Sequence, residues 1–95
     1  MKITSKKVPA KTATAIMRAV NMRGDAILFE VSPPYYSNKY IISSAIDNEF
    51  GMETYLFAAD EHGKVVNWTE LPGSTRWVYD PYRPLADEGY TVKRL

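Results

Sequence analysis

Three runs of β-forming residues, separated by short turn-forming segments, constrain the fold of this chain most strongly. The runs cover residues 26–31, 39–46 and 53–59. They are rich in isoleucine, phenylalanine and tyrosine, and proline, glycine, asparagine or aspartate stands between them. This composition is typical of strands bounded by turns. The spacing therefore predicts three consecutive strands of an antiparallel meander, with the first strand ended by Ser32, Pro33 and Pro34.

Two shorter segments extend this predicted sheet. Residues 60–63 form a turn-like sequence, and residues 64–68 then have the pattern of a short returning strand. Residues 90–94 alternate in polarity and are expected to form a closing strand. Within the second run, the small residues Ser43 and Ser44 indicate a strand packed at the centre of the sheet.

A short helix is predicted close to the C-terminus, after a loop that spans residues 69–79. Asp80 is a favourable N-cap residue, and Pro81 suits the first helical position. Gly89 is placed where a glycine commonly ends a helix. The sequence therefore predicts helical structure between Asp80 and Gly89.

The N-terminal residues 10–23 allow two interpretations. Apolar residues recur there at helical spacing: Ala13, Ile16, Met17 and Val20. This pattern favours a helix of about three turns that ends at Gly24. Alternatively, residues 14–20 form a strand that pairs with residues 26–31, since Gly24 can adopt a positive φ in the connecting loop. The sequence alone does not decide between helix and strand.

Length and composition favour one domain over residues 1–95, with residues 1–9 as a candidate flexible basic arm. The 45% hydrophobic content is sufficient for a core, and the absence of cysteine excludes disulfides, thiolate metal sites and a cysteine nucleophile. We expect an α+β fold in which an antiparallel sheet of four to five strands is covered on one face by one or two short helices. A small all-β barrel is the alternative.

The net charge of +1 conceals a strong asymmetry. The first 23 residues contain six basic and no acidic side chains, whereas the remainder carries a net charge of −5. A basic segment beside an acidic body can contact a polyanion, fold onto the acidic body or remain a solvated face. Its candidate nucleic-acid-binding residues are Lys2, Lys6, Lys7, Lys11, Arg18 and Arg23. Nucleic-acid binding is therefore the alternative function.

The sequence contains no motif for catalysis or for cofactor binding. Glycine-rich phosphate loops and a nucleophile elbow are absent, and the single histidine, His62, lies in a predicted turn. Four acidic residues give only a weak indication of a hard-metal site: Asp47, Glu49, Asp60 and Glu61. We therefore expect a protein that is not an enzyme and that has no catalytic residue, metal or cofactor.

Aromatic residues are concentrated near two loops. Some of them must fill the core of so small a domain, but tyrosine and tryptophan are also enriched at protein interfaces. One group flanks the prolines at positions 33 and 34, and the other lies in the second half of the chain. The candidate protein-binding residues are Tyr35, Tyr36, Tyr40, Trp77 and Tyr79. We expect the loops around Tyr35 and Trp77 to form one aromatic and acidic surface.

Residues 25–90 resemble small accessory proteins encoded by tailed phages and prophages. The resemblance includes the segments 29–35, 39–45, 53–60 and 63–74, and it excludes the basic N-terminal segment. It implies a viral accessory protein, with no activity or site residue attached. Because catalytic motifs are absent and aromatic residues are abundant, we expect a non-enzymatic binding protein that docks on a host or phage protein. Because no transmembrane run or secretory signal is seen, a cytoplasmic location is expected. A homo-oligomer is possible through strand edges at residues 53–59 or 90–94.

Overall fold

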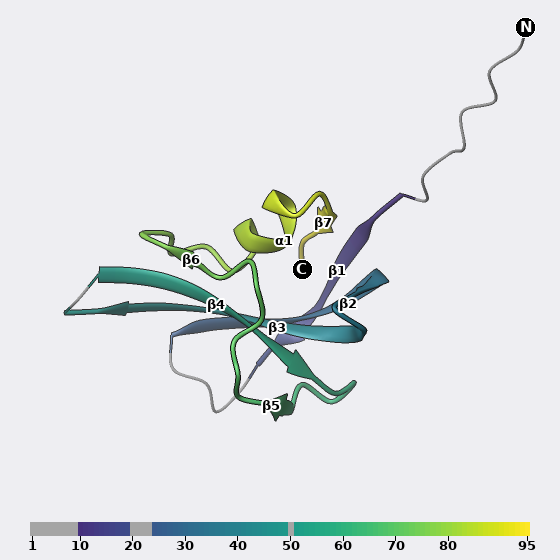
Figure 1. Cartoon of the computed structure of the whole chain (residues 1–95), viewed down its shortest axis with the longest axis horizontal. Coiled ribbons are helices and arrows are strands. Elements are labelled where there is room, and N and C mark those ends of the chain that lie inside the picture. Colours follow the sequence, from purple (N-terminus) through teal and green to yellow (C-terminus); the bar gives the residue numbers. More distant parts are fainter. Residues whose placement is uncertain (1–9, 20–23, 50) are drawn as a thin grey trace, which may run out of the picture.

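The computed structural model describes residues 10–19, 24–49 and 51–95. Its centre is formed by three long antiparallel strands, β2 (Asp25–Tyr35), β3 (Asn38–Asn48) and β4 (Gly51–Ala59) (Figure 1). The predicted meander is confirmed. It forms because these runs are rich in β-branched and aromatic residues, and turn residues separate them.

The N-terminal segment is a strand, β1 (Thr12–Arg18), which pairs antiparallel with β2. Of the two interpretations of this segment, the strand is correct. Ala13 and Ala15 are both buried, so alternate side chains enter the core, and the strand period prevails over the helical spacing. Gly24, just before β2, has a φ of +76°, as the strand interpretation requires. A bulge between Ala15 and Met17 shifts the pairing register.

Three short strands complete the sheet: β5 (Val65–Asn67), β6 (Thr75–Arg76) and β7 (Thr91–Lys93). The strand order is β5-β4-β3-β2-β1-β7, and β6 pairs separately with β4. β7 runs parallel to β1, whereas all other pairs are antiparallel. The sheet thus has more strands than the four to five predicted, and it is mixed rather than purely antiparallel. Within the described residues it is open, since β5 and β7 are not paired with each other.

One helix, α1 (Arg83–Asp87), is present in the described part of the chain. It lies inside the predicted segment but begins later than predicted, with Tyr82 instead of Asp80 at its N-cap. Asp80 lies two residues before this N-cap and stabilises the turn that leads into the helix, because its Oδ1 accepts a hydrogen bond of 2.9 Å from the Tyr82 amide. The fold is therefore mostly sheet with very little helix. None of the described residues forms a helix with the length and apolar character of a membrane span.

The two faces of the sheet are covered by different segments (Figure 1). The larger core is covered by the C-terminal residues, and Leu85 of α1 packs there with Phe29 and Leu56. A smaller cluster lies on the opposite face around Leu28 and Ile42. The β4–β5 hairpin folds over this second face, because Gly63 at its turn lies against Met17 and Leu28.

Two sequence predictions of strand boundaries are wrong. β2 does not end at the prolines but continues through Pro33 and Pro34 to Tyr35, with a cis peptide bond between Ser32 and Pro33. The loop predicted for residues 69–79 contains β6. Prolines are tolerated in a strand where no ladder hydrogen bond is needed from them, and the regular pairing of β2 with β3 is interrupted between Glu30 and Tyr35.

The serines of β3 lie where the sequence places them. β3 has two strands on one side and three on the other along the main order of the sheet, and both Ser43 and Ser44 are buried. Their small side chains fit where a covered sheet leaves little space. The predicted central strand is thus confirmed.

Candidate functional site

The outer edge of β4 is covered along its length by residues 65–77, which we call the covering segment. β5 pairs with the end of β4 at Ala58 and Ala59, and β6 pairs near its start. Between them, Leu56 donates to the Ser74 hydroxyl (3.1 Å) and accepts a hydrogen bond from the Leu71 amide (2.7 Å). The edge at residues 53–59, expected to be available for pairing between copies, is therefore occupied by the chain itself.

Trp77 ends the covering segment and projects into solvent. Its side chain is 73% exposed, and its backbone has a φ of +64°, a region that costs a bulky residue about 1–3 kcal/mol. The Trp77 amide donates a hydrogen bond of 2.6 Å to the Met52 carbonyl. Its ring lies over Gly51, where an added Cβ would be 2.6 Å from Cζ3. The fold therefore holds an exposed indole on a backbone fixed from two sides.

Two exposed residues lie close to Trp77 along the backbone. Met52 and Tyr79 are both exposed, and residues 77–80 are held beside β4 because the Thr54 hydroxyl donates 2.6 Å to the Val78 carbonyl. We call Met52, Trp77 and Tyr79 the Trp77 patch. Exposed large apolar side chains are a feature of interaction sites.

A second aromatic surface lies farther along β4, on the face over which the hairpin folds. Tyr55 and Phe57 are two residues apart on the strand and share one face, with ring centroids 6.2 Å apart. Trp68 of the covering segment packs edge-on against Phe57 at 5.5 Å and is still 66% exposed. We call Tyr55, Phe57 and Trp68 the aromatic row.

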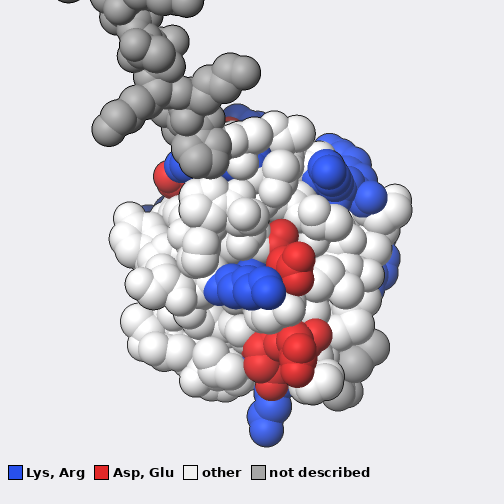
Figure 2. All heavy atoms as spheres, turned by 90° about the vertical axis from the view of Figure 1, so that its right-hand side faces the viewer, with Lys and Arg blue, Asp and Glu red and all other residues white. Residues whose placement is uncertain are grey.

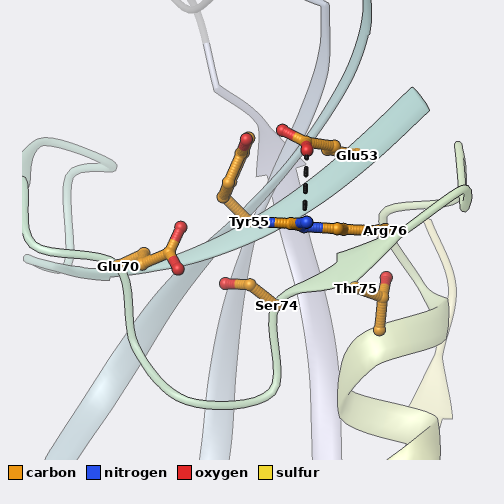
Figure 3. A pocket seen from close by; sticks show the side chains of 6 residues that line it. All are labelled: Glu53, Tyr55, Glu70, Ser74, Thr75 and Arg76. Carbon is orange, nitrogen blue, oxygen red and sulfur yellow. Dashed lines mark ion pairs between the residues drawn. The ribbon is translucent and has the colours of Figure 1, made fainter. Parts of the chain in front are cut away.

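A small pocket of about 120 Å³ lies between β4 and the covering segment. Six residues line it: Glu53, Tyr55, Glu70, Ser74, Thr75 and Arg76. Figure 3 shows Glu53 and Arg76 facing each other on one side and Glu70 on the other, with Tyr55 and Ser74 between them.

The charges of the pocket are only partly balanced. Arg76 Nε is 3.8 Å from Glu53 Oε1, and the arginine side chain is 84% exposed, so this ion pair is weak. Glu70 forms no ion pair with any residue that the structure describes. Two carboxylates therefore face one guanidinium. Across the described ranges, no three acidic or histidine residues lie close enough to hold a metal ion, and the arrangement suits a cationic group.

The predicted contact residue Tyr35 lies in the core. Only 7% of it is exposed, and its hydroxyl donates a hydrogen bond of 2.6 Å to the Pro72 carbonyl. Burial, with a smaller effect of the Glu88 charge, raises the pKa of Tyr35 to about 12. Tyr35 is therefore a structural residue and is not available to a partner, because β2 continues through the prolines and turns its side chain inward.

Two other predicted residues remain accessible in part. Tyr36 is exposed in the turn between β2 and β3, with its ring edge-on to Tyr35 at 4.7 Å. Tyr40 is half-buried, and its hydroxyl donates to Glu30 Oε2 at 3.2 Å. Desolvation and this hydrogen bond raise the pKa of Tyr40.

The structure does not bring the two predicted aromatic loops together. Tyr36 lies at one end of β3, and Trp77 lies beside Gly51 at the other. An 11-residue strand spans about 35 Å. The expectation that the loops around Tyr35 and Trp77 form a single surface is therefore wrong. They form two separate regions, and the backbone of Trp77 is held by a hydrogen bond to Met52.

Only two of the six candidate nucleic-acid-binding residues are described. Lys11 donates to the Glu88 carbonyl at 3.3 Å, with its ammonium 5.2 Å from the Tyr90 ring centre, and Arg18 forms an ion pair with Asp25. The remaining four lie outside the described residues: Lys2, Lys6, Lys7 and Arg23. On the end of the molecule shown in Figure 2, basic side chains form separate groups with acidic ones among them.

His62 belongs to the turn between β4 and β5, as the sequence indicates. It is exposed, and its amide donates to Asp60 Oδ1 at 2.9 Å. The Lys64 amide donates to the same oxygen at 2.9 Å, and these hydrogen bonds lower the pKa of Asp60. Asp60 therefore organises the turn.

The sequence interpretation missed the aromatic row and the pocket. Alternation within residues 53–59 contains a signal for part of them, because Glu53, Tyr55 and Phe57 must share one face of a strand. Nothing local indicates that Glu70 and Arg76 approach that face, since the covering segment brings them there.

No protein-family model matches the chain, and neither the curated proteins nor the solved structures contain a match.

Proposed function

We propose that this protein is a non-enzymatic binding protein that docks on another protein through the covering segment and its two exposed tryptophans. The observation that carries the proposal is Trp77, which is exposed while its backbone is held in a left-handed conformation. A left-handed backbone at a bulky residue costs free energy and persists only where the surrounding structure enforces it. Residues in such conformations cluster at functional sites.

The physical basis is the way tryptophan contributes to binding. A buried indole removes a large apolar area from water, and tryptophan is enriched among the residues that dominate interface energies. The hydrogen bond to Met52 and the contact with Gly51 order Trp77 before binding. Less conformational entropy is then lost when a partner closes over it.

The partner that we propose is a protein of a host cell or of a phage, as a phage accessory protein would require. The covering segment is long enough to contact such a partner at two points, through the Trp77 patch and through Trp68 in the aromatic row. The nucleic-acid alternative gains no support from the described residues, because Lys11 and Arg18 both have partners within the chain.

The experiment compares capture of proteins from nuclease-treated host lysate by the tagged wild type and two variants. Trp77→Ala removes the central side chain, and Tyr36→Ala removes an exposed aromatic at the opposite end of β3. We expect a protein captured by the wild type and by Tyr36→Ala to be reduced at least tenfold with Trp77→Ala, about 1.4 kcal/mol of affinity.

Thermal unfolding of both variants serves as the folding control. Equal capture of the same proteins by all three forms would contradict the proposal. A parallel capture from untreated lysate tests the other function: proteins that the wild type captures there, but not after nuclease treatment, would support the nucleic-acid alternative.

A further inference from the structure

We propose that the pocket between β4 and the covering segment receives a lysine or arginine side chain of the partner. This inference rests on the proposed function and specifies the chemistry of the partner at that same surface. The partner segment would place its cation between Glu53 and Glu70.

The size and lining of the pocket support a single side chain as its occupant. A volume of about 120 Å³ is too small for a typical small-molecule ligand, which fills about 300 Å³ or more. The Tyr55 ring can cover the methylene groups and favours a cation near its face. Of the lining residues, Ser74 is already fixed, because its hydroxyl donates to the Leu71 carbonyl at 3.1 Å. Hydrogen bonds to β4 and to the covering segment thus fix the Ser74 side of the pocket.

The excess of carboxylates in the pocket favours a positively charged occupant. Glu70 has no cation partner within the described ranges, and Glu53 has only the long contact to Arg76. The Glu53 side chain is 27% exposed, so its carboxylate is less screened by water than a fully exposed one. A cation that enters the pocket would meet two carboxylates, whereas an anion would meet one exposed guanidinium and two like charges.

Arg76 then acts as a competitor that belongs to the chain itself. It occupies Glu53 with a contact that is weak and exposed, so a partner cation can displace it or bind beside it. Removing the Arg76 charge should therefore strengthen binding of a cation. If the pocket instead binds an anion, removing the Arg76 charge should weaken binding. The direction of this change therefore distinguishes a cation site from an anion site.

The position of the pocket fits one continuous partner segment. Glu70 follows Trp68 by two residues, and Arg76 directly precedes Trp77. A partner that contacts both tryptophans along the covering segment must pass over the pocket. We therefore expect the partner segment to carry a basic residue between two apolar residues, which contact the two tryptophans.

The test uses small probes and the whole protein, and it does not require the partner. N-acetyl-lysine methylamide and N-acetyl-arginine methylamide are titrated into isotope-labelled protein, and amide shifts are followed by NMR. The norleucine analogue lacks the charge, and the glutamate analogue reverses it. We expect saturable shifts in the millimolar range at residues 53, 70 and 74–76 with the cationic probes alone.

Matched variants then test the roles of the charges. Glu70→Gln should weaken binding of the cationic probes about threefold, and Glu53→Gln should also weaken it. Arg76→Gln should strengthen binding about twofold, while Glu61→Gln, an exposed acid of the β4–β5 turn, should have no effect. Higher ionic strength should reduce binding in every form.

Several outcomes would overturn the inference. The first is that the norleucine analogue causes shifts equal to those of the cationic probes. The second is that the glutamate analogue binds and that this binding is lost in Arg76→Gln. The third is that no probe causes a saturable shift. The result is independent of the partner test. A pocket that binds the cationic probes in a protein whose Trp77→Ala variant still captures every partner would contradict the proposed function alone.

Discussion

Tyr35 donates a hydrogen bond of 2.6 Å to the carbonyl oxygen of Pro72, which ties the end of β2 to the covering segment. A second tyrosine makes a related connection, since the Tyr90 hydroxyl donates to the Pro33 carbonyl at 2.7 Å. The two rings pack edge to face, with centroids 6.1 Å apart. The C-terminal half of the chain is thus fastened to the β2–β3 hairpin from both sides.

Replacing Tyr35 by phenylalanine should lower the free energy of unfolding by about 1–2 kcal/mol, because the partly buried Pro72 carbonyl loses its donor. Tyr36→Phe is the control, since this neighbour is exposed. Chemical denaturation of both variants measures the difference. An equal effect of the two substitutions would show that the hydrogen bond to Pro72 contributes nothing.

Alkaline pH should destabilise the protein through the same residue. The pKa of Tyr35 is raised to about 12 in the folded protein, against about 10 in an unfolded chain, and the pKa of Tyr90 is raised as well by burial. A raised folded pKa contributes stability that is complete below pH 10 and is lost as the pH rises toward 12. Denaturation midpoints at pH 8 and pH 11 should differ less in Tyr35→Phe than in the wild type.

Two glycines with similar backbones should respond differently to alanine. Gly24 and Gly89 have φ angles of +76° and +92°, so alanine is strained at both. At Gly24 a Cβ would also be 2.0 Å from the Ala45 carbonyl oxygen, whereas at Gly89 the nearest atom, in Lys11, is 3.8 Å away. We expect Gly89→Ala to cost about 1 kcal/mol and Gly24→Ala considerably more. Similar unfolding energies for the two variants would contradict the clash at Ala45.

The central strands could be predicted because their signals are local. Residues 26–31, 39–46 and 53–59 are rich in β-forming side chains, and turn residues separate the runs. The N-terminal segment stayed ambiguous, since its apolar spacing fits a helix while alternate residues such as Ala13 and Ala15 suit a strand. Pairing with β2 makes this segment a strand, and such pairing between segments is not encoded in the local sequence pattern.

The short strands and the site could not be predicted, because they depend on long-range pairing. β6 has only two residues and exists because they meet β4, and β7 is parallel to a strand almost eighty residues earlier. The burial of Tyr35 follows from β2 continuing through two prolines, against the usual preference. Of the predicted contact residues, Tyr36, Trp77 and Tyr79 are exposed, whereas Tyr35 is buried.

Two buried hydroxyls should give opposite results when they are removed. Ser43 is fully buried and its Oγ has no hydrogen-bond partner among the described residues, whereas the equally buried Thr54 hydroxyl donates to the Val78 carbonyl at 2.6 Å. Ser43→Ala should raise the free energy of unfolding by about 1 kcal/mol, and Thr54→Val should lower it by about 1–2 kcal/mol. Denaturation of both variants measures this, and a loss of stability in Ser43→Ala would point to a partner for its hydroxyl.

Acid should loosen the β4–β5 turn through Asp60. Its carboxylate accepts hydrogen bonds from the His62 and Lys64 amides, and these hold the pKa of Asp60 below its usual value. A lowered folded pKa contributes stability that is present above the unfolded pKa and is lost as the pH falls through the folded pKa. We therefore expect hydrogen exchange at the two amides to become less protected, relative to the intrinsic rate, below about pH 4.

Two substitutions separate the charge of Asp60 from its hydrogen bonds. Asp60→Asn keeps an acceptor oxygen and should make protection of the turn independent of acid, whereas Asp60→Ala should lose protection at every pH. Because Gly63 in this turn lies against Met17 and Leu28, loosening it should also expose the smaller cluster on the second face. Acid-dependent protection that persists in Asp60→Asn would assign the effect to a different group.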